Sequence, residues 1–290
     1  MIEKIAYFLY RVGRKGILLI LVCVVFSTYT IFFGGENSAD SEIYFLDVGQ
    51  GDSELIILEN NIKILIDGGP PNGKALKELD NIISANDRYI DIVLLSHPEL
   101  DHFGGFVEIL RGYEVGIFLW NGLDVDTVVF KTLRDILKEN DVREMVVLAG
   151  DKIYYSKNTL SVLSPQNITA GDENLNDTSL VVSFRGAGGS VLFTGDISEK
   201  VEKSMHFFGT SIDVLKIPHH GSKHSSSLGF LSAIHPKISV IEVGKNSYGH
   251  PSPDVIQRIK RAGGGVYRTD RDGTIRLSFE KNGIFVYLRK

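Results

Sequence analysis

Residues 96–105 read SHPELDHFGG, a run in which four potential metal ligands occur within six positions. The four side chains are those of His97, Glu99, Asp101 and His102. The run follows apolar residues at 91–96 that are typical of a buried strand, and it precedes a predicted helix. A loop at a strand end can bring imidazole and carboxylate groups to one or two divalent cations, so the pattern predicts a metal site.

The alternative for this run is a polar loop in which Asp101 only caps the following helix. That interpretation suits any one of the four residues better than it suits all four together after an apolar strand. Gly104 and Gly105 close the run. Glycine permits close backbone approach, which is typical of a ligand loop packed against neighbouring chain.

Two later apolar runs also end in potential ligands. Asp196 ends FTGD at 193–196, and His219 and His220 lie in IPHHGS at 217–222. Each is a weaker signal alone, because Gly-Asp is common in turns and paired histidines can lie on a surface. With the first run, they predict one site at strand ends between two β-rich halves.

Two further loops are rich in polar groups. DVGQGDS at 47–53 predicts a nest of backbone N–H groups for an anion, with the side chains of Asp47, Gln50 and Asp52 in support. KNSYGHP at 245–251 predicts a phosphate clamp, with donors on Lys245, Tyr248 and His250. An ordinary hairpin turn and an ordinary surface loop are the alternatives.

The run GILLILVCVVFSTYTIFF at 16–33 carries no charge and is near the lower length limit for a bilayer span. Basic residues precede it and acidic residues follow it. This bias predicts a cytoplasmic N-terminus at 1–15, a single-pass anchor at 16–33, a linker at 34–41 and an extracytoplasmic domain at 42–290. A cleaved signal peptide, which would give a secreted protein, and a buried helix are the alternatives. Cys23 is the only cysteine, so no intrachain disulfide can form.

Apolar periodicity predicts that 42–290 is one α/β (α+β) domain of alternating strands and helices. Strands are expected at 43–47, 54–58, 62–67, 91–96, 115–120, 178–184, 190–194, 214–217 and 238–243, with others before 163 and after 265. Helices are expected at 74–86, 105–112, 127–139, 197–208 and 254–262. The formal net charge is −5, so the chain lacks the broad basic surface of a typical nucleic-acid binder.

The chain resembles the metallo-β-lactamase fold, and within it the hydrolase domain of ComEC-type competence proteins, which act in DNA uptake. The resemblance covers nearly all of 42–290, in order, through FLDVGQGDS, ILIDGG, LLSHPELDHFGG, NDTSLV, LFTGD, LKIPHHGSKHSSS, VGKNSYGHP and YRTDRDGTI. It implies a four-layered αββα sandwich, here preceded by one N-terminal transmembrane helix.

The resemblance also implies roles for individual residues. The family pattern H-x-H-x-D-H is matched by His97, Asp101 and His102, with Glu99 in place of the second histidine. Asp67 would support the metal loop, and Asp196 would bridge two metals. His219 or His220 would be the last histidine ligand. Asn176 or Asp177 would replace the remaining histidine of the family pattern.

The implied ligands divide between two metal positions. One keeps Asp101, His102, Asp196 and a histidine from 219–220. The other keeps His97, Glu99, Asp196 and Asn176, and is richer in oxygen. Hard oxygen ligands favour Mn²⁺ or Mg²⁺ over Zn²⁺ more than a three-histidine site does. We therefore expect two divalent ions, Zn²⁺ or Mn²⁺.

The implied activity is metal-dependent hydrolysis of a phosphodiester, with DNA as substrate and a water activated by two metals as nucleophile. Asp101 or His250 would handle protons, and Lys245 or Tyr248 would stabilise charge. An acidic domain fits weak or single-strand engagement of DNA. Hydrolysis of a small ester, lactone or lactam, and a non-catalytic metal-binding module, are the alternatives. One apolar segment leaves no room for a channel, so the chain would act either with a separate channel protein or in an extracellular process unrelated to DNA uptake.

We expect the purified protein to carry bound divalent metal, with Mn²⁺ competing with Zn²⁺, because the second position is rich in oxygen ligands. Elemental analysis of protein purified without chelator measures this. Protein that keeps its activity with no bound divalent ion would contradict the prediction.

Overall fold

The structure is a computed structural model that describes residues 41–168, 174–205 and 211–290. Within these ranges, no helix has both the length and the apolar character required to cross a bilayer. The predicted anchor at 16–33 and the predicted cytoplasmic residues 1–15 lie outside the described ranges. Of the predicted linker only its last residue is described, and that residue already begins the first strand.

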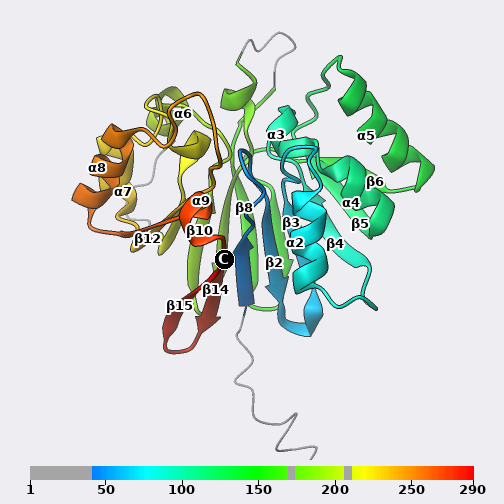
Figure 1. Cartoon of the computed structure of the whole chain (residues 1–290), viewed down its shortest axis with the longest axis horizontal. Helices are drawn as coiled ribbons and strands as arrows, with labels where there is room; N and C mark the ends of the chain where they lie inside the picture. Colours follow the sequence, from blue (N-terminus) through cyan, green and yellow to red (C-terminus); the bar gives the residue numbers. More distant parts are fainter. Residues whose placement is uncertain (1–40, 169–173, 206–210) are drawn as a thin grey trace, which may run out of the picture. The chain divides into compact units, whose positions relative to one another are not determined.

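The described strands form two sheets that pack face to face, with helices on both outer faces (Figure 1). The first sheet has the order β15-β14-β1-β2-β3-β4-β5-β6. Its strands are β1 (Ser41–Phe45), β2 (Glu54–Leu58), β3 (Lys63–Ile66), β4 (Tyr89–Leu94), β5 (Glu114–Trp120), β6 (Arg143–Val146), β14 (Thr274–Glu280) and β15 (Gly283–Arg289). The second sheet has the order β13-β12-β11-β10-β9-β8-β7. Its strands are β7 (Lys152–Tyr155), β8 (Asn158–Ser164), β9 (Val181–Gly186), β10 (Gly189–Phe193), β11 (Val214–Lys216), β12 (Ile238–Ile241) and β13 (Gly265–Arg268).

The helices divide between the two outer faces. The first face is covered by α2 (Lys74–Ile82), α4 (Phe106–Gly112) and α5 (Val128–Glu139). The second face is covered by α6 (Glu199–Ser204), α7 (Leu228–Ile234) and α8 (Pro253–Ala262). The shorter helical segments are α3 (Leu100–Phe103), α9 (Thr269–Asp272), η1 (Glu59–Asn61), η2 (Leu175–Thr178) and η3 (Pro218–Gly221).

Three apolar layers hold this arrangement together, one between the sheets and one under each set of helices. Because strand side chains alternate, the central strands bury apolar groups on both faces. Strand β3, for example, sends Ile64 to the layer between the sheets and Leu65 to the layer under α2 and α4. The predicted αββα sandwich is therefore confirmed.

Two predicted features of the architecture need correction. The two sheets are not the two halves of the sequence, because β14 returns to pair with β1, with Ser41 opposite Phe279. The predicted helix at 74–86 ends at Ile82, and the backbone of Ile83 is extended.

Helix α7 was not predicted. It follows a serine-rich loop, and the Ser227 hydroxyl accepts a hydrogen bond from the Phe230 amide at its start.

We expect Phe184→Ala to lower the free energy of unfolding by about 3–5 kcal/mol, because it opens a cavity between the sheets. Phe184 is fully buried, and its ring meets the ring of Phe279 edge-on at 6.1 Å. Chemical denaturation followed through the single tryptophan, Trp120, measures the change. Phe285→Ala is the control, since Phe285 is 43% exposed on β15. Equal losses in the two variants would contradict the packing described.

Candidate metal centre

The predicted ligands meet where strands from both sheets end. In the first sheet, Asp67 follows β3 and His97 lies in the loop after β4. In the second sheet, Asp196 follows β10, and His219 and His220 follow β11. Strands β3 and β4 run parallel, as do β10 and β11, so their carboxyl ends lie together at one end of the sandwich. The structure thus brings together ligands that lie more than a hundred residues apart.

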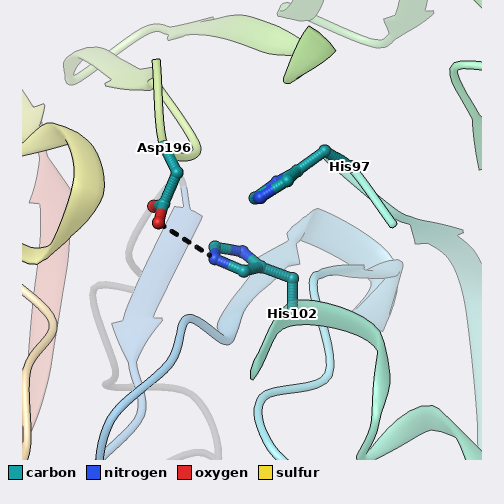
Figure 2. A group of neighbouring side chains, drawn as sticks. All are labelled: His97, His102 and Asp196. Carbon is teal, nitrogen blue, oxygen red and sulfur yellow. Dashed lines mark ion pairs between the residues drawn. The ribbon is translucent and has the colours of Figure 1, made fainter. Parts of the chain in front are cut away.

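Asp196 lies at the centre of the cluster. Its Oδ2 atom is 3.4 Å from His102 Nε2 and 3.4 Å from His220 Nε2. Figure 2 shows the Asp196 carboxylate facing the rings of His97 and His102, whose centroids are 4.2 Å apart. The side chains of Asp196, His97, His102 and His220 are all nearly or fully buried.

The two adjacent histidines differ in position. His220 is buried, and its Nε2 atom is 3.3 Å from Asp101 Oδ2 as well as close to Asp196. His219 is 29% exposed, and its Nε2 atom is 3.9 Å from Asp196 Oδ2. The geometry therefore favours His220 as the ligand and leaves His219 on the wall of the site, a choice that the sequence had left open.

These distances fit a shared cation. Ligand atoms about 2.0–2.2 Å from one metal lie roughly 3–3.5 Å from one another. The groups His97–His102–Asp196 and Asp101–His102–His220 each place one atom per residue within 4.8 Å of the others. In addition, His102 Nε2 is buried without a hydrogen-bond partner among the described residues. Buried polar atoms are normally paired, so the donor set suits a metal.

Hydrogen bonds at the far ring nitrogens orient two of the imidazoles. His102 Nδ1 is 2.8 Å from Asp67 Oδ2, and His220 Nδ1 is 2.9 Å from the Glu242 carbonyl oxygen. Each bond directs the Nε2 atom toward Asp196. Metal-binding histidines are commonly held in this way by a carboxylate or a carbonyl group. Asp67 thus has the place expected of a residue that supports the loop.

His97 is held by a different set of contacts. Ser96 Oγ donates to Asp67 Oδ2 at 2.6 Å, and it lies 3.0 Å from His97 Nδ1. Because the hydroxyl has one proton, it accepts from Nδ1–H, and the Nε2 lone pair then faces Asn176 Oδ1 at 3.0 Å. Burial and the nearby His102 lower the pKa of His97 to about 3, so the ring is neutral. The His97 Nε2 lone pair and the Asn176 Oδ1 atom are therefore both acceptors, and a cation bound to both would satisfy them.

The pKa values of His102 and His220 also favour a cation at this position. Burial disfavours the charged form of His220, but Asp196 and Asp52 outweigh it and raise its pKa to about 10. Burial is likewise outweighed at His102, whose pKa is well above its usual value because Asp196, Asp67 and Asp52 surround it. These carboxylates therefore favour positive charge at this point, and a divalent ion would replace the protons of the two rings.

Several charged residues beneath the cluster were missed by sequence reasoning. Lys216, the last residue of β11, is fully buried and forms an ion pair with Asp52. Its Nζ atom is 3.5 Å from Asp196 Oδ1 and donates to the Gly195 carbonyl oxygen at 2.9 Å. The available signal was a lysine in an otherwise apolar strand, VLKI, next to the paired histidines.

Glu54 and Glu242 complete this buried layer. Burial and the neighbouring carboxylates raise the pKa of both side chains well above the usual range, so both are held neutral. The ionised groups beneath the site are then Asp52, Asp196 and Lys216. One lysine partly balances the two carboxylates of this layer.

A cavity of about 400 Å³ opens at the cluster. It is lined by Gln50, Pro70, Pro71, Glu99, Leu100, Asp101, Asp196, His219, His220, Tyr248 and His250. The predicted residues Gln50, Glu99, Tyr248 and His250 thus face the site. Lys245 is exposed and outside this lining. Asp47 lies outside it too, 3.9 Å from Lys74 Nζ.

The predicted anion nest at 47–53 stays a prediction, and some of its backbone donors are already paired. Four of its backbone N–H groups already donate within the protein, from Asp47 to Thr274 Oγ1, from Val48 to the Leu46 carbonyl, from Asp52 to the Asp101 carbonyl and from Ser53 to Glu242 Oε1. The glycines instead allow close packing. A Cβ on Gly51 would lie 2.3 Å from the Asp101 carbonyl oxygen, and one on Gly105 would lie 2.0 Å from the Gly68 carbonyl oxygen. Close approach was expected of Gly105, and it is confirmed.

Comparisons with known proteins agree with this architecture. Residues 46–119 match the Metallo-beta-lactamase superfamily. The metallo-beta-lactamase fold protein YhfI from Bacillus subtilis superposes with a TM-score of 0.56 at 11% identity, covering 82% of this chain and 100% of that one. The chain therefore has the metallo-beta-lactamase fold.

Other known proteins share a higher sequence identity with this chain. ComE operon protein 3 of Bacillus subtilis (strain 168) is 29% identical over 263 residues, which cover 84% of this chain and 34% of that protein. Recombination protein 2 of Haemophilus influenzae is 30% identical over 238 residues, covering 81% and 28% respectively. The chain is homologous to ComE operon protein 3, and it spans about a third of the length of these relatives.

We expect Lys216→Met to lower the free energy of unfolding by about 3–5 kcal/mol, because it removes the ammonium group of the ion pair with the buried Asp52 carboxylate. Denaturation followed through Trp120 fluorescence measures the loss. Lys237→Met is the matched control. Lys237 pairs with Asp213 at 2.8 Å but is 74% exposed, so its loss should cost less than about 1 kcal/mol. A Lys216 variant as stable as this control would show that the buried pair is dispensable.

Proposed function

We propose that this protein is a metal-dependent hydrolase that cleaves phosphodiesters, with DNA as its substrate. The observation that carries the proposal is the convergence of His102 Nε2 and His220 Nε2 on Asp196 Oδ2, at the floor of an open cavity. Two cations bound there would acidify a water and neutralise charge on phosphoryl oxygens.

The residues around the cluster can perform distinct tasks. His97, Glu99, Asn176 and Asp196 would hold one cation, and Asp101, His102, His220 and Asp196 would hold the other. Burial raises the pKa of Asp101, but the hydrogen bond from His220 and the charge of His102 outweigh it and hold that pKa below its usual range. Asp101 therefore stays ionised, as a ligand must. The oxygen-rich position of His97, Glu99 and Asn176 supports Mn²⁺ as a rival to Zn²⁺.

His250 is placed to handle a proton at the mouth of the cavity. It lines the cavity, and its ring centroid is 5.5 Å from that of His219. Burial and the nearby His219 lower the pKa of His250 to about 4, so the ring is neutral at pH 7. The neutral ring presents a nitrogen that accepts a hydrogen bond there, and its lowered pKa makes it a weak base.

The charge of the lining supports dependence on metal. The cavity is lined by Glu99, Asp101 and Asp196, and none of its described lining residues is a lysine or an arginine. Without bound cations, the protonated His102 and His220 offset these carboxylates, and no net positive charge remains to attract a phosphodiester. A substrate with a charged phosphate would therefore bind productively only after the metals.

The relatives support nucleic acid as the substrate class. The chain resembles ComEC-type competence proteins, which act in DNA uptake, and one relative is named for recombination. Anchoring by residues 16–33, an extracytoplasmic location and cooperation with a separate channel protein extend the proposal, and they rest on the sequence alone.

The test is an assay of the full chain on oligonucleotides with Mn²⁺, Mg²⁺ and Zn²⁺ compared. We expect metal-dependent cleavage that chelator abolishes, and a fall in kcat/KM of about a hundredfold or more in Asp196→Asn, because both metal positions share that carboxylate. Metal content and unfolding of each variant are measured in parallel.

Asp254→Asn is the matched control for this assay, since Asp254 is an exposed carboxylate in the first turn of α8. It should cleave like the unaltered chain. Full activity in Asp196→Asn would refute the proposed centre. Bound metal without cleavage of any phosphodiester would refute the proposed substrate class.

A further inference from the structure

Tyr248 projects from the rim of the cavity with 75% of its surface exposed. The loop that carries it is nevertheless tightly held. Asn246 Nδ2 donates to the carbonyl oxygens of Gly244 and His250, each at 2.9 Å. Asn246 Oδ1 accepts from the amides of Tyr248 at 3.1 Å and His250 at 3.0 Å. One side chain thus makes four hydrogen bonds that fix the backbone on both sides of an exposed aromatic ring.

The rings continue from this rim into the metal centre. The ring centroids of Tyr248 and His250 lie 5.7 Å apart with a 32° tilt. His250 is 5.5 Å from His219, and His219 is 6.1 Å from His220, the buried ligand candidate. An aromatic row therefore leads from solvent to the place where a scissile phosphate would lie.

The composition of the cavity limits what can attract a nucleic acid there. Backbone binding ordinarily relies on lysine and arginine, and none is present among the described lining residues. Stacking of bases on aromatic rings does not need those charges and is tolerant of sequence. It does require an unpaired base with an accessible face, which a single strand or a frayed end offers and an intact duplex does not.

Resting on the function proposed above, we infer that Tyr248 is a stacking platform that binds an unpaired base and guides single-stranded nucleic acid into the metal centre. Asn246 is the positioning residue, since it fixes the backbone that carries the ring. The substrate class is thereby narrowed to single-stranded ends or segments.

The experiment measures binding of the metal-loaded full chain to a fluorescent, nuclease-resistant phosphorothioate oligothymidylate. An abasic phosphorothioate strand of the same length and charge is the comparison ligand. Tyr248→Ala should weaken binding of oligothymidylate about five- to tenfold and leave binding of the abasic strand unchanged. Tyr248→Trp should bind oligothymidylate as well as the unaltered chain, or better.

Tyr154→Ala is the matched control, because Tyr154 is 69% exposed on β7 and outside the cavity lining. It should bind both strands like the unaltered chain. Equal binding of oligothymidylate by Tyr248→Ala and by the unaltered chain overturns the inference. So does an unaltered chain that binds the abasic strand as tightly as oligothymidylate. Cleavage of ordinary oligonucleotides is scored separately, so that failure of the proposed hydrolysis is distinguished from failure of stacking.

Discussion

The ionised carboxylate of Asp196, buried where the two sheets meet, imposes the main constraint on this structure. A buried charge is tolerable only when it is paired and hydrogen-bonded. Lys216 approaches this carboxylate from below at 3.5 Å, and the rings of His102 and His220 face it from the site side at 3.4 Å. The strand ends that supply those groups must therefore stay in register with one another. Stability and metal binding depend on the same few atoms.

The fold could be predicted from sequence because the signals for it are local. Apolar strands, Gly-Asp turns and ligand loops each show in a few consecutive residues, and their order matches a known family pattern. The pairing of β14 with β1 could not be predicted in this way, because it joins segments at opposite ends of the domain. Helix α7 was missed since serine suggests a loop and only tertiary packing selects the helix.

The sequence indicates some members of the candidate site and not others, and the reasons are physical. Candidate ligands such as His97 and Asp196 can be recognised by residue type and by position at a strand end. The choice of His220 over His219 depends on which ring turns inward, and that follows from a bond to the Glu242 carbonyl. The burial of Lys216 depends on carboxylates far away in sequence. An isolated lysine in an apolar strand is therefore a useful signal of a charged site nearby.

The closing hairpin of β14 and β15 has a consequence for how the chain is made. Strand β1 has β2 on one side and β14 on the other, so one edge of β1 stays unpaired until Thr274–Glu280 has emerged from the ribosome. Contacts of such sequence separation form slowly, and an open strand edge invites pairing with other chains. A polypeptide stopped before Thr274 would expose that edge permanently. Folding of this domain thus depends on synthesis past β14, and shorter products would be the ones that aggregate.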